Sequence, residues 1–150
     1  MEQKDYDTLK TTHSNLPEFT VLDQEFFISQ IEAKTHVLVE IKRKIAEKME
    51  TVLHFLTGLL NPEGINIFEC RSLTKKDQQE LLDTYRHLME YYRLLLETDI
   101  ISTEQAHSSA IAQTTKVWIE NKEKILEIIQ KTRSNWKKTI EPKEVLDYLG

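Results

Sequence analysis

The chain has 150 residues and a formal net charge of −5, with 39% hydrophobic and 30% charged residues and a single cysteine. This length suits one domain, and the acidic balance disfavours a dedicated nucleic-acid binder, whose phosphate contacts require a basic surface. A single cysteine excludes an intramolecular disulfide, a thiolate metal cluster and a Cys-x-x-Cys redox pair, and it suits a reducing cytoplasm. No apolar run is long enough for a secretion signal or a membrane span, so we expect a cytoplasmic protein without a membrane segment.

The first segment, residues 1–19, is predicted to be a polar N-terminal arm. It mixes charged residues with threonine and serine, and its few apolar side chains follow no sustained period. The rest of the chain contains too few glycines and prolines for the turns of a β-rich fold. We therefore predict that residues 20–150 form a single all-α domain, a bundle of three long amphipathic helices and a short C-terminal helix.

The first long helix is predicted over 20–60. Thr20 and Asp23 have the spacing of a capping box at its start. Its apolar residues recur mainly every three or four positions, as one buried helical face requires: Phe27, Ile31, Leu38, Ile41, Ile45, Met49, Val52, Leu56 and Leu59. Two consecutive steps of four interrupt a strict heptad, which indicates a bundle helix rather than a long coiled coil.

The connection over 61–73 follows a clear stop signal, because Pro62 cannot continue a helix and Gly64 readily adopts a left-handed conformation. The connection is too apolar for a solvated loop, so we expect it to pack over one end of the bundle. Cys70 lies within it, and we interpret this residue as a buried, unreactive thiol.

Two further long helices are predicted over 74–98 and 102–140, followed by a short helix over 142–149. Thr74 with Asp77 again has the capping-box spacing. The second helix has a wide apolar face made of two parallel stripes, which is typical of a helix with several neighbours: Leu81, Tyr85, Leu88, Tyr92 and Leu95, and Leu82, Met89 and Leu96.

These ranges predict helices of unequal length. At 1.5 Å per residue, the first and third helices should be on the order of 55 to 60 Å long and the second about 35 Å. The second helix would then leave about 20 Å of two apolar stripes uncovered. Because most homo-oligomers are closed two-fold dimers, we expect a second copy of the chain to complete the bundle as a homodimer.

Glu104 and His107 are the nearest approach to a metal site. A Glu-x-x-His pair places a carboxylate and an imidazole on one helical face, as di-iron bundle proteins require. Those proteins need the pair twice, whereas here it occurs once, in the first turn of a predicted helix. We therefore interpret the pair as part of a solvated first turn and expect neither a metal nor another cofactor.

Four residues are the best candidates for a small-molecule pocket between helices: Tyr85, Tyr92, Trp118 and Lys122. Their rings would supply apolar walls, and the hydroxyls and the amine would supply polar points. The same aromatic residues also suit core packing or a protein interface. The sequence contains no Gly-x-Ser-x-Gly elbow and no glycine-rich phosphate loop, so it favours a protein that is not an enzyme.

A basic cluster lies near Trp136, toward the end of the third helix, and it could contact phosphates: Lys131, Arg133, Lys137 and Lys138. Cations near a helix C-terminus also complement the helix dipole, and the chain as a whole is acidic, so nucleic-acid binding is disfavoured.

The leading hypothesis is a non-enzymatic helical interaction or scaffold module that forms a dimer and binds a protein partner. Two alternatives stay open. One is a small-molecule or metal-binding helical bundle, and the other is a nucleic-acid-associated factor that uses the basic cluster.

Overall fold

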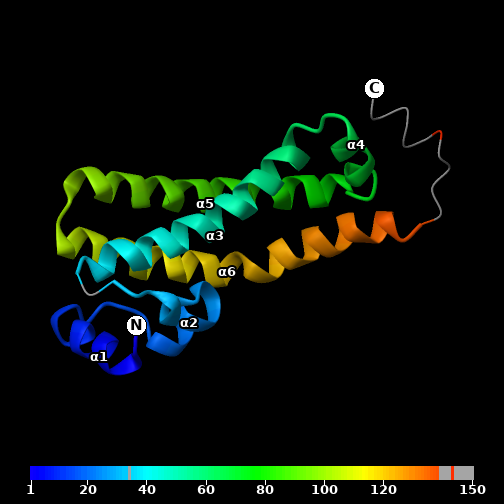
Figure 1. Ribbon diagram of the computed structural model, residues 1–150. Coiled ribbons are helices and arrows are strands. Elements are labelled where there is room, and N and C mark those ends of the chain that lie inside the picture. The colour runs from blue at the N-terminus through cyan, green and yellow to red at the C-terminus, as the bar shows by residue number, and fades with distance from the viewer. Residues whose placement is uncertain (34, 139–142, 144–150) are drawn as a thin grey trace. The chain divides into compact units, whose positions relative to one another are not determined.

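The computed structural model describes residues 1–33, 35–138 and 143, and every regular element in these residues is a helix (Figure 1). The predicted all-α class is therefore confirmed. In chain order the elements are α1 (Gln3–Thr12), α2 (Phe19–Phe26), the 3-10 helix η1 (Ile28–Gln30), α3 (Val37–Leu60), α4 (Ile65–Cys70), α5 (Lys75–Ile101) and α6 (Glu104–Trp136). No helix within the described residues is long and apolar enough to cross a membrane.

The chain divides into two compact units. Of the described residues, unit 1 comprises those in 1–51 and 88–119, and unit 2 comprises those in 52–87 and from 120 onward. Helices α3, α5 and α6 contribute residues to both units.

The N-terminal segment is folded into unit 1, so its prediction as an arm is wrong. Tyr6 of α1 is fully buried, and its hydroxyl donates a hydrogen bond to the carbonyl of Pro17 at 2.6 Å. The Tyr6 and Phe19 rings lie 5.6 Å apart, and Leu16 is also buried. These apolar residues follow no common period because they belong to two short helices and the turn between them.

The single helix predicted over 20–60 is interrupted, which corrects the sequence interpretation. Helix α2 ends at Phe26, and the next residue, Phe27, adopts a left-handed conformation with φ of 56° and is 55% exposed instead of buried. The Asp23 carboxylate accepts the backbone N–H of Ser29 at 2.7 Å and so stabilises the turn. Phe26 and Ile28, only two positions apart, are both buried, which a continuous helix does not favour. Residues 18–57 contain neither glycine nor proline, so the sequence carried no break signal.

Helix α3 follows the predicted pattern more closely. Its buried apolar residues recur every three or four positions: Leu38, Ile41, Ile45, Met49, Leu53, Leu56 and Leu59. The helix ends at Leu60, before Pro62, as expected. Gly58 remains helical, and a Cβ atom there would lie 2.9 Å from the Asn66 side chain of α4. Glycine thus allows α4 to approach the end of α3.

In unit 2, the predicted connection 61–73 contains α4, which packs against the C-terminal part of α6. The Asn135 side-chain amide donates to the carbonyls of Phe68 at 3.3 Å and Glu69 at 3.0 Å. The rings of Phe68 and Trp136 lie 5.1 Å apart. Within unit 2, the connection therefore packs against the C-terminal part of α6; its packing over one end of a bundle stays a prediction.

The predicted capping box at the start of α5 is present. The backbone N–H of Thr74 donates to the Asp77 carboxylate at 2.8 Å, and the N–H of Asp77 donates to the Thr74 hydroxyl at 3.2 Å. The Asp77 carboxylate also forms an ion pair with Lys131 of α6. At the start of α6, the hydroxyl of Thr103 accepts the backbone N–H of Ala106 at 3.2 Å.

Replacing Asp77 with alanine should lower the free energy of unfolding by about 1–2 kcal/mol, the usual cost of losing an N-cap interaction. Lys131 and the Thr74 N–H lower the pKa of Asp77 from 3.8 to about 2. The charged form is therefore favoured in the folded state, and its contribution should vanish as the pH falls from about 4 to about 2. Urea unfolding at neutral and acidic pH measures both effects. Asp77→Asn, which keeps a capping oxygen, should lose less stability at neutral pH; a loss equal to that of Asp77→Ala would contradict the capping role.

The homodimer was expected because the second helix was predicted to be much shorter than the other two. The observed helix lengths do not support that reasoning. Helices α3, α5 and α6 contain 24, 27 and 33 residues, or about 36, 40 and 50 Å at the usual helix rise. The first helix is shorter than predicted because of the break after α2, and the second is longer because α5 continues to Ile101. Apart from residue 143, the short helix predicted over 142–149 lies outside the described residues.

Candidate functional site

Unit 1 contains a buried polar cluster centred on Lys42 of α3, which is only 3% exposed. Its ammonium lies 3.1 Å from the hydroxyl of Thr98 and 3.2 Å from Nδ1 of His107, and it forms an ion pair with Asp99. We call these four residues the Lys42 cluster. It joins α3 to the end of α5 and to the first turn of α6.

Sequence reasoning missed this cluster. Lys42 lies four positions after Leu38 and three before Ile45, on the buried face of α3. A lysine at a buried position of a helical stripe is the signal that would have revealed it, because such a charge requires buried partners. The adjacent Arg43 behaves as a surface residue and pairs with Glu40 and Glu47.

Glu104 and His107, the weak metal candidates, each have a different closest partner in the structure. The side chain of Glu104 is 80% exposed and lies 3.5 Å from Nε2 of His13, whereas Nδ1 of the buried His107 faces the Lys42 ammonium. Within residues 1–33, 35–138 and 143, no group of three or more His, Cys, Asp or Glu side chains is arranged to hold a metal ion.

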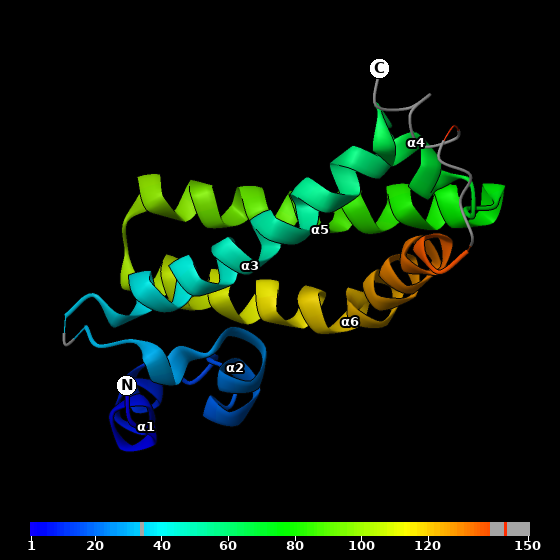
Figure 2. The ribbon, with the colours of Figure 1, turned by 45° about the vertical axis from the view of Figure 1, so that its right-hand side comes forward.

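A second cluster in unit 1 surrounds Trp118 of α6, where α2 lies beside α6 (Figure 1 and Figure 2). The indole N–H donates to the buried carboxylate of Glu25 at 2.9 Å, and the Phe26 ring lies 5.8 Å away. The Lys48 ammonium lies 5.2 Å from the Trp118 ring, 5.8 Å from Phe26 and 5.7 Å from Phe27, and it donates to the Glu25 carbonyl. These cation–π and hydrogen-bonding interactions stabilise the packing of α2 against α3 and α6.

The four predicted pocket residues are divided between the units. Tyr92 and Trp118 belong to unit 1, and Tyr85 and Lys122 belong to unit 2. Trp118 is 3% exposed and packs within the core of unit 1, while the other three are half-buried. None of the four lines either of the two cavities described below. Neither of these two cavities supports the proposed pocket, which remains a prediction.

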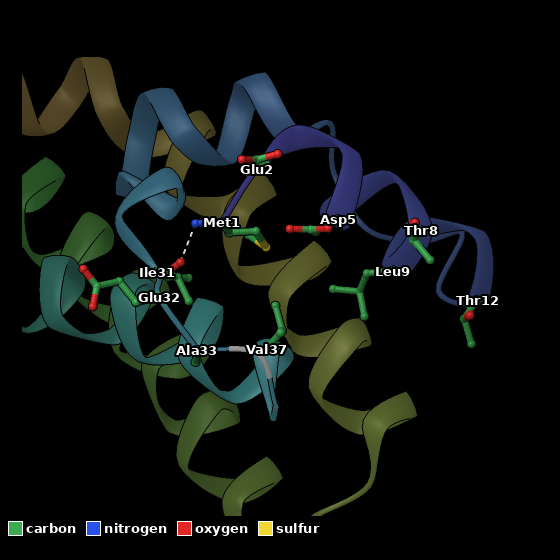
Figure 3. A pocket seen from close by; sticks show the side chains of 10 residues that line it. All are labelled: Met1, Glu2, Asp5, Thr8, Leu9, Thr12, Ile31, Glu32, Ala33 and Val37. Carbon is green, nitrogen blue, oxygen red and sulfur yellow. Dashed lines mark hydrogen bonds between the residues drawn. The ribbon is translucent and has the colours of Figure 1, made fainter.

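A cavity of about 840 Å³ lies between α1 and the segment that leads into α3 (Figure 3). Asp5 and Leu9 of α1 and Val37 of α3 point toward the same space. The amino group of Met1 donates to the carbonyls of Ser29, at 2.7 Å, and Ile31. The described lining residues carry three carboxylates and two hydroxyls among apolar side chains: Met1, Glu2, Asp5, Thr8, Leu9, Thr12, Ile31, Glu32, Ala33 and Val37. The three carboxylates favour an amine with an apolar part as a ligand.

A smaller cavity of about 240 Å³ lies in unit 2 beside Cys70, and nearly all of its lining is apolar: Leu59, Leu60, Pro62, Cys70, Leu73, Gln78 and Leu81. The Cys70 thiol is half-buried and donates to the carbonyl of Leu59 at 3.4 Å. Burial raises the pKa of this thiol, and the nearby Glu69 carboxylate adds to the effect.

Cys70 should therefore react slowly with iodoacetamide. The thiolate is the reactive form, so a raised pKa reduces the reaction rate. We expect alkylation of the folded protein at mildly alkaline pH to be several-fold slower than alkylation of the urea-unfolded protein. Mass spectrometry of timed samples gives both rates; equal rates would contradict the sequestered thiol.

The basic cluster near Trp136 is less available than the sequence indicated. Lys131 forms an ion pair with Asp77, which raises the pKa of the lysine. The Lys138 ammonium donates a hydrogen bond to the Asn135 side chain at 3.1 Å. Arg133 and Lys137 are exposed. The indole of Trp136 donates to the Glu69 carboxylate at 2.7 Å, so an acidic side chain lies within the cluster.

Large apolar side chains are exposed along α5 and α6. On the part of α6 that belongs to unit 2 they are separated by three and seven positions, the spacing of one heptad stripe: Leu126, Ile129 and Trp136, with exposures of 45, 37 and 45%. On α5, Leu82 and Leu96 are 39% and 42% exposed. Comparison with protein-family models, with curated proteins and with solved structures finds no match to this chain.

Proposed function

We propose that this protein is a non-enzymatic helical interaction module that binds a helical partner through the exposed apolar stripe of α6. The observation that supports this proposal is the spacing of Leu126, Ile129 and Trp136 within unit 2, three and seven positions apart, at exposures between 37 and 45%. Apolar side chains at such positions are the contacts that one helix offers to another.

A second copy of the chain is the simplest partner with this chemistry, and we propose a homodimer on that ground instead of on helix length. Complete burial of a leucine or isoleucine is worth roughly 1.5–3 kcal/mol, so each partly exposed residue would contribute roughly 1 kcal/mol. Association costs at least roughly 4 kcal/mol in lost freedom of motion. We therefore expect self-association in the micromolar range or weaker. We also propose a cytoplasmic location, which the single cysteine supports.

Self-association tests this proposal directly. Leu126→Glu combined with Ile129→Glu places two charges on the stripe and should shift the equilibrium to monomer by at least about tenfold in dissociation constant, or about 1.4 kcal/mol. Sedimentation velocity over a wide concentration range gives that constant. The control is Gln113→Glu, which adds a carboxylate at an exposed position on the opposite side of α6.

The control variant should associate as the unchanged protein does. If the unchanged protein is monomeric at every concentration, or if the double variant associates equally well, the stripe is not a self-association surface. Unchanged circular dichroism in both variants establishes that the helices remain folded.

A second candidate function, binding of a small molecule, is supported by the cavity of Figure 3 rather than by the four residues predicted for it. Hexylamine and hexanoate have the same apolar chain and opposite charges. We expect hexylamine alone to raise the unfolding temperature, and Asp5→Asn to weaken that effect, because the Asp5 carboxylate points into the cavity. Equal effects of the two compounds would exclude a charge-selective site.

A further inference from the structure

The Lys42 cluster contains as many acceptors as its ammonium has hydrogens. A lysine ammonium has three N–H donors, and the three acceptors are the Thr98 hydroxyl, the Asp99 carboxylate and Nδ1 of His107. Thr98 and His107 are 3% and 5% exposed, so water does not readily replace either of them. This arrangement holds α3 against the end of α5 and the first turn of α6.

His107 can accept this hydrogen bond only as a neutral imidazole with its proton on Nε2. Protonation would place an N–H donor on Nδ1, 3.2 Å from an ammonium that cannot accept it. Two positive charges would then face each other in a buried site, where their repulsion is weakly screened.

The groups that face His107 come from three helices. Lys42 approaches from α3, Asp99 from α5, and Glu104 from the first turn of α6 itself. The two carboxylates are 55% and 80% exposed, and they already face Lys42 and His13, respectively. Burial and Lys42 therefore outweigh the carboxylates and lower the pKa of His107 below 6.5.

We propose that Lys42 and His107 form a pH-sensitive switch, which fastens the connection between α5 and α6 to α3 at neutral pH and releases it when His107 gains a proton. The connection is short, and one of its residues, Ser102, has a φ of 54°, a conformation that serine rarely adopts. Contacts on both sides hold this residue in place. Loss of the Lys42–His107 contact removes the contact on the α6 side of Ser102 and allows the connection to rearrange.

The sign of the effect follows from the direction of the shift. The pKa of His107 is lower in the folded protein than in the unfolded chain, so between these two values the unfolded chain binds more protons. Unit 1 therefore loses stability as the pH falls below 6.5, and it regains this stability when the pH is raised.

The experiment compares His107→Asn with an unchanged His107 in a Trp136→Phe background, in which Trp118 is the only tryptophan and reports on unit 1. Asparagine offers an oxygen acceptor to Lys42 but does not titrate. We expect the urea midpoint, followed by fluorescence, to fall between mildly alkaline and mildly acidic pH in the parent. In His107→Asn the fall should be at least halved.

The matched control is His36→Asn. His36 is exposed, and asparagine tolerates its left-handed backbone (φ of 56°), so this variant should keep the parent's pH dependence. An equal fall in His107→Asn and the parent, or no fall in the parent, would overturn the proposal.

An NMR titration of the histidine rings gives a second readout that does not depend on the stability of any variant. We expect His107 to titrate below 6.5 in the unchanged protein, and its pKa to rise in Lys42→Met. A His107 pKa at or above 6.5 in the unchanged protein would overturn the proposal even if His107→Asn failed to fold.

Discussion

Replacing Trp118 with alanine should lower the free energy of unfolding of unit 1 by about 3–5 kcal/mol, the cost of removing a large buried aromatic side chain. Trp118 is 3% exposed, lies 5.8 Å from the Phe26 ring and donates to the Glu25 carboxylate at 2.9 Å. The change would therefore leave a cavity and also remove a hydrogen bond to a buried charge, which adds to the loss. Urea unfolding followed by circular dichroism measures the effect.

Two variants separate these contributions. Trp118→Phe keeps an aromatic ring but loses the N–H donor, so it should cost less than Trp118→Ala. Trp136→Ala removes a tryptophan that is 45% exposed and belongs to unit 2, and it should cost about 1–2 kcal/mol, because less apolar surface returns to water. An equal loss of unfolding free energy in the two alanine variants would contradict the role of Trp118 in holding α2 against α6.

Replacing Tyr6 with alanine should have the second largest effect and should release α1 from unit 1. The ring is fully buried and lies 5.6 Å from that of Phe19, and the hydroxyl donates to the Pro17 carbonyl at 2.6 Å. Loss of this ring should cost about 3–5 kcal/mol. Limited proteolysis with trypsin should then cleave after Lys10 much faster than in the unchanged protein, because a segment that unfolds locally becomes a protease substrate.

Tyr6→Phe is the matched control, because it keeps the buried ring and removes only the hydroxyl. It should cost about 1 kcal/mol, the usual net value of one hydrogen bond, and cleavage after Lys10 should remain slow. Equal cleavage of the unchanged protein and Tyr6→Ala would mean that α1 is not held by this side chain.

The candidate sites could be predicted only partly from the sequence, because each site combines residues that are distant in the chain. Lys42 and His107 are 65 positions apart, and Glu25 and Trp118 are 93 apart. Periodicity reports which face of one helix is buried, but it does not report which polar groups of other helices meet there. Glu104 and His107 are neighbours on one helix, as the sequence indicated. Their closest partners, His13 and Lys42, come from other parts of the chain and could not be predicted from periodicity.

The sequence by itself determined the helical class, the buried stripe of α3, its end before Pro62 and the capping box of Thr74 and Asp77. These features depend on local periodicity, proline chemistry and contacts within one turn, so a short stretch of sequence contains all of their causes. Only the tertiary structure decided the break after α2, the burial of α1 and the Lys42 cluster. A helix breaks at Phe27 without glycine or proline because burial of Phe26, Ile28 and the Glu25 carboxylate against other helices outweighs the local preference for a continuous helix.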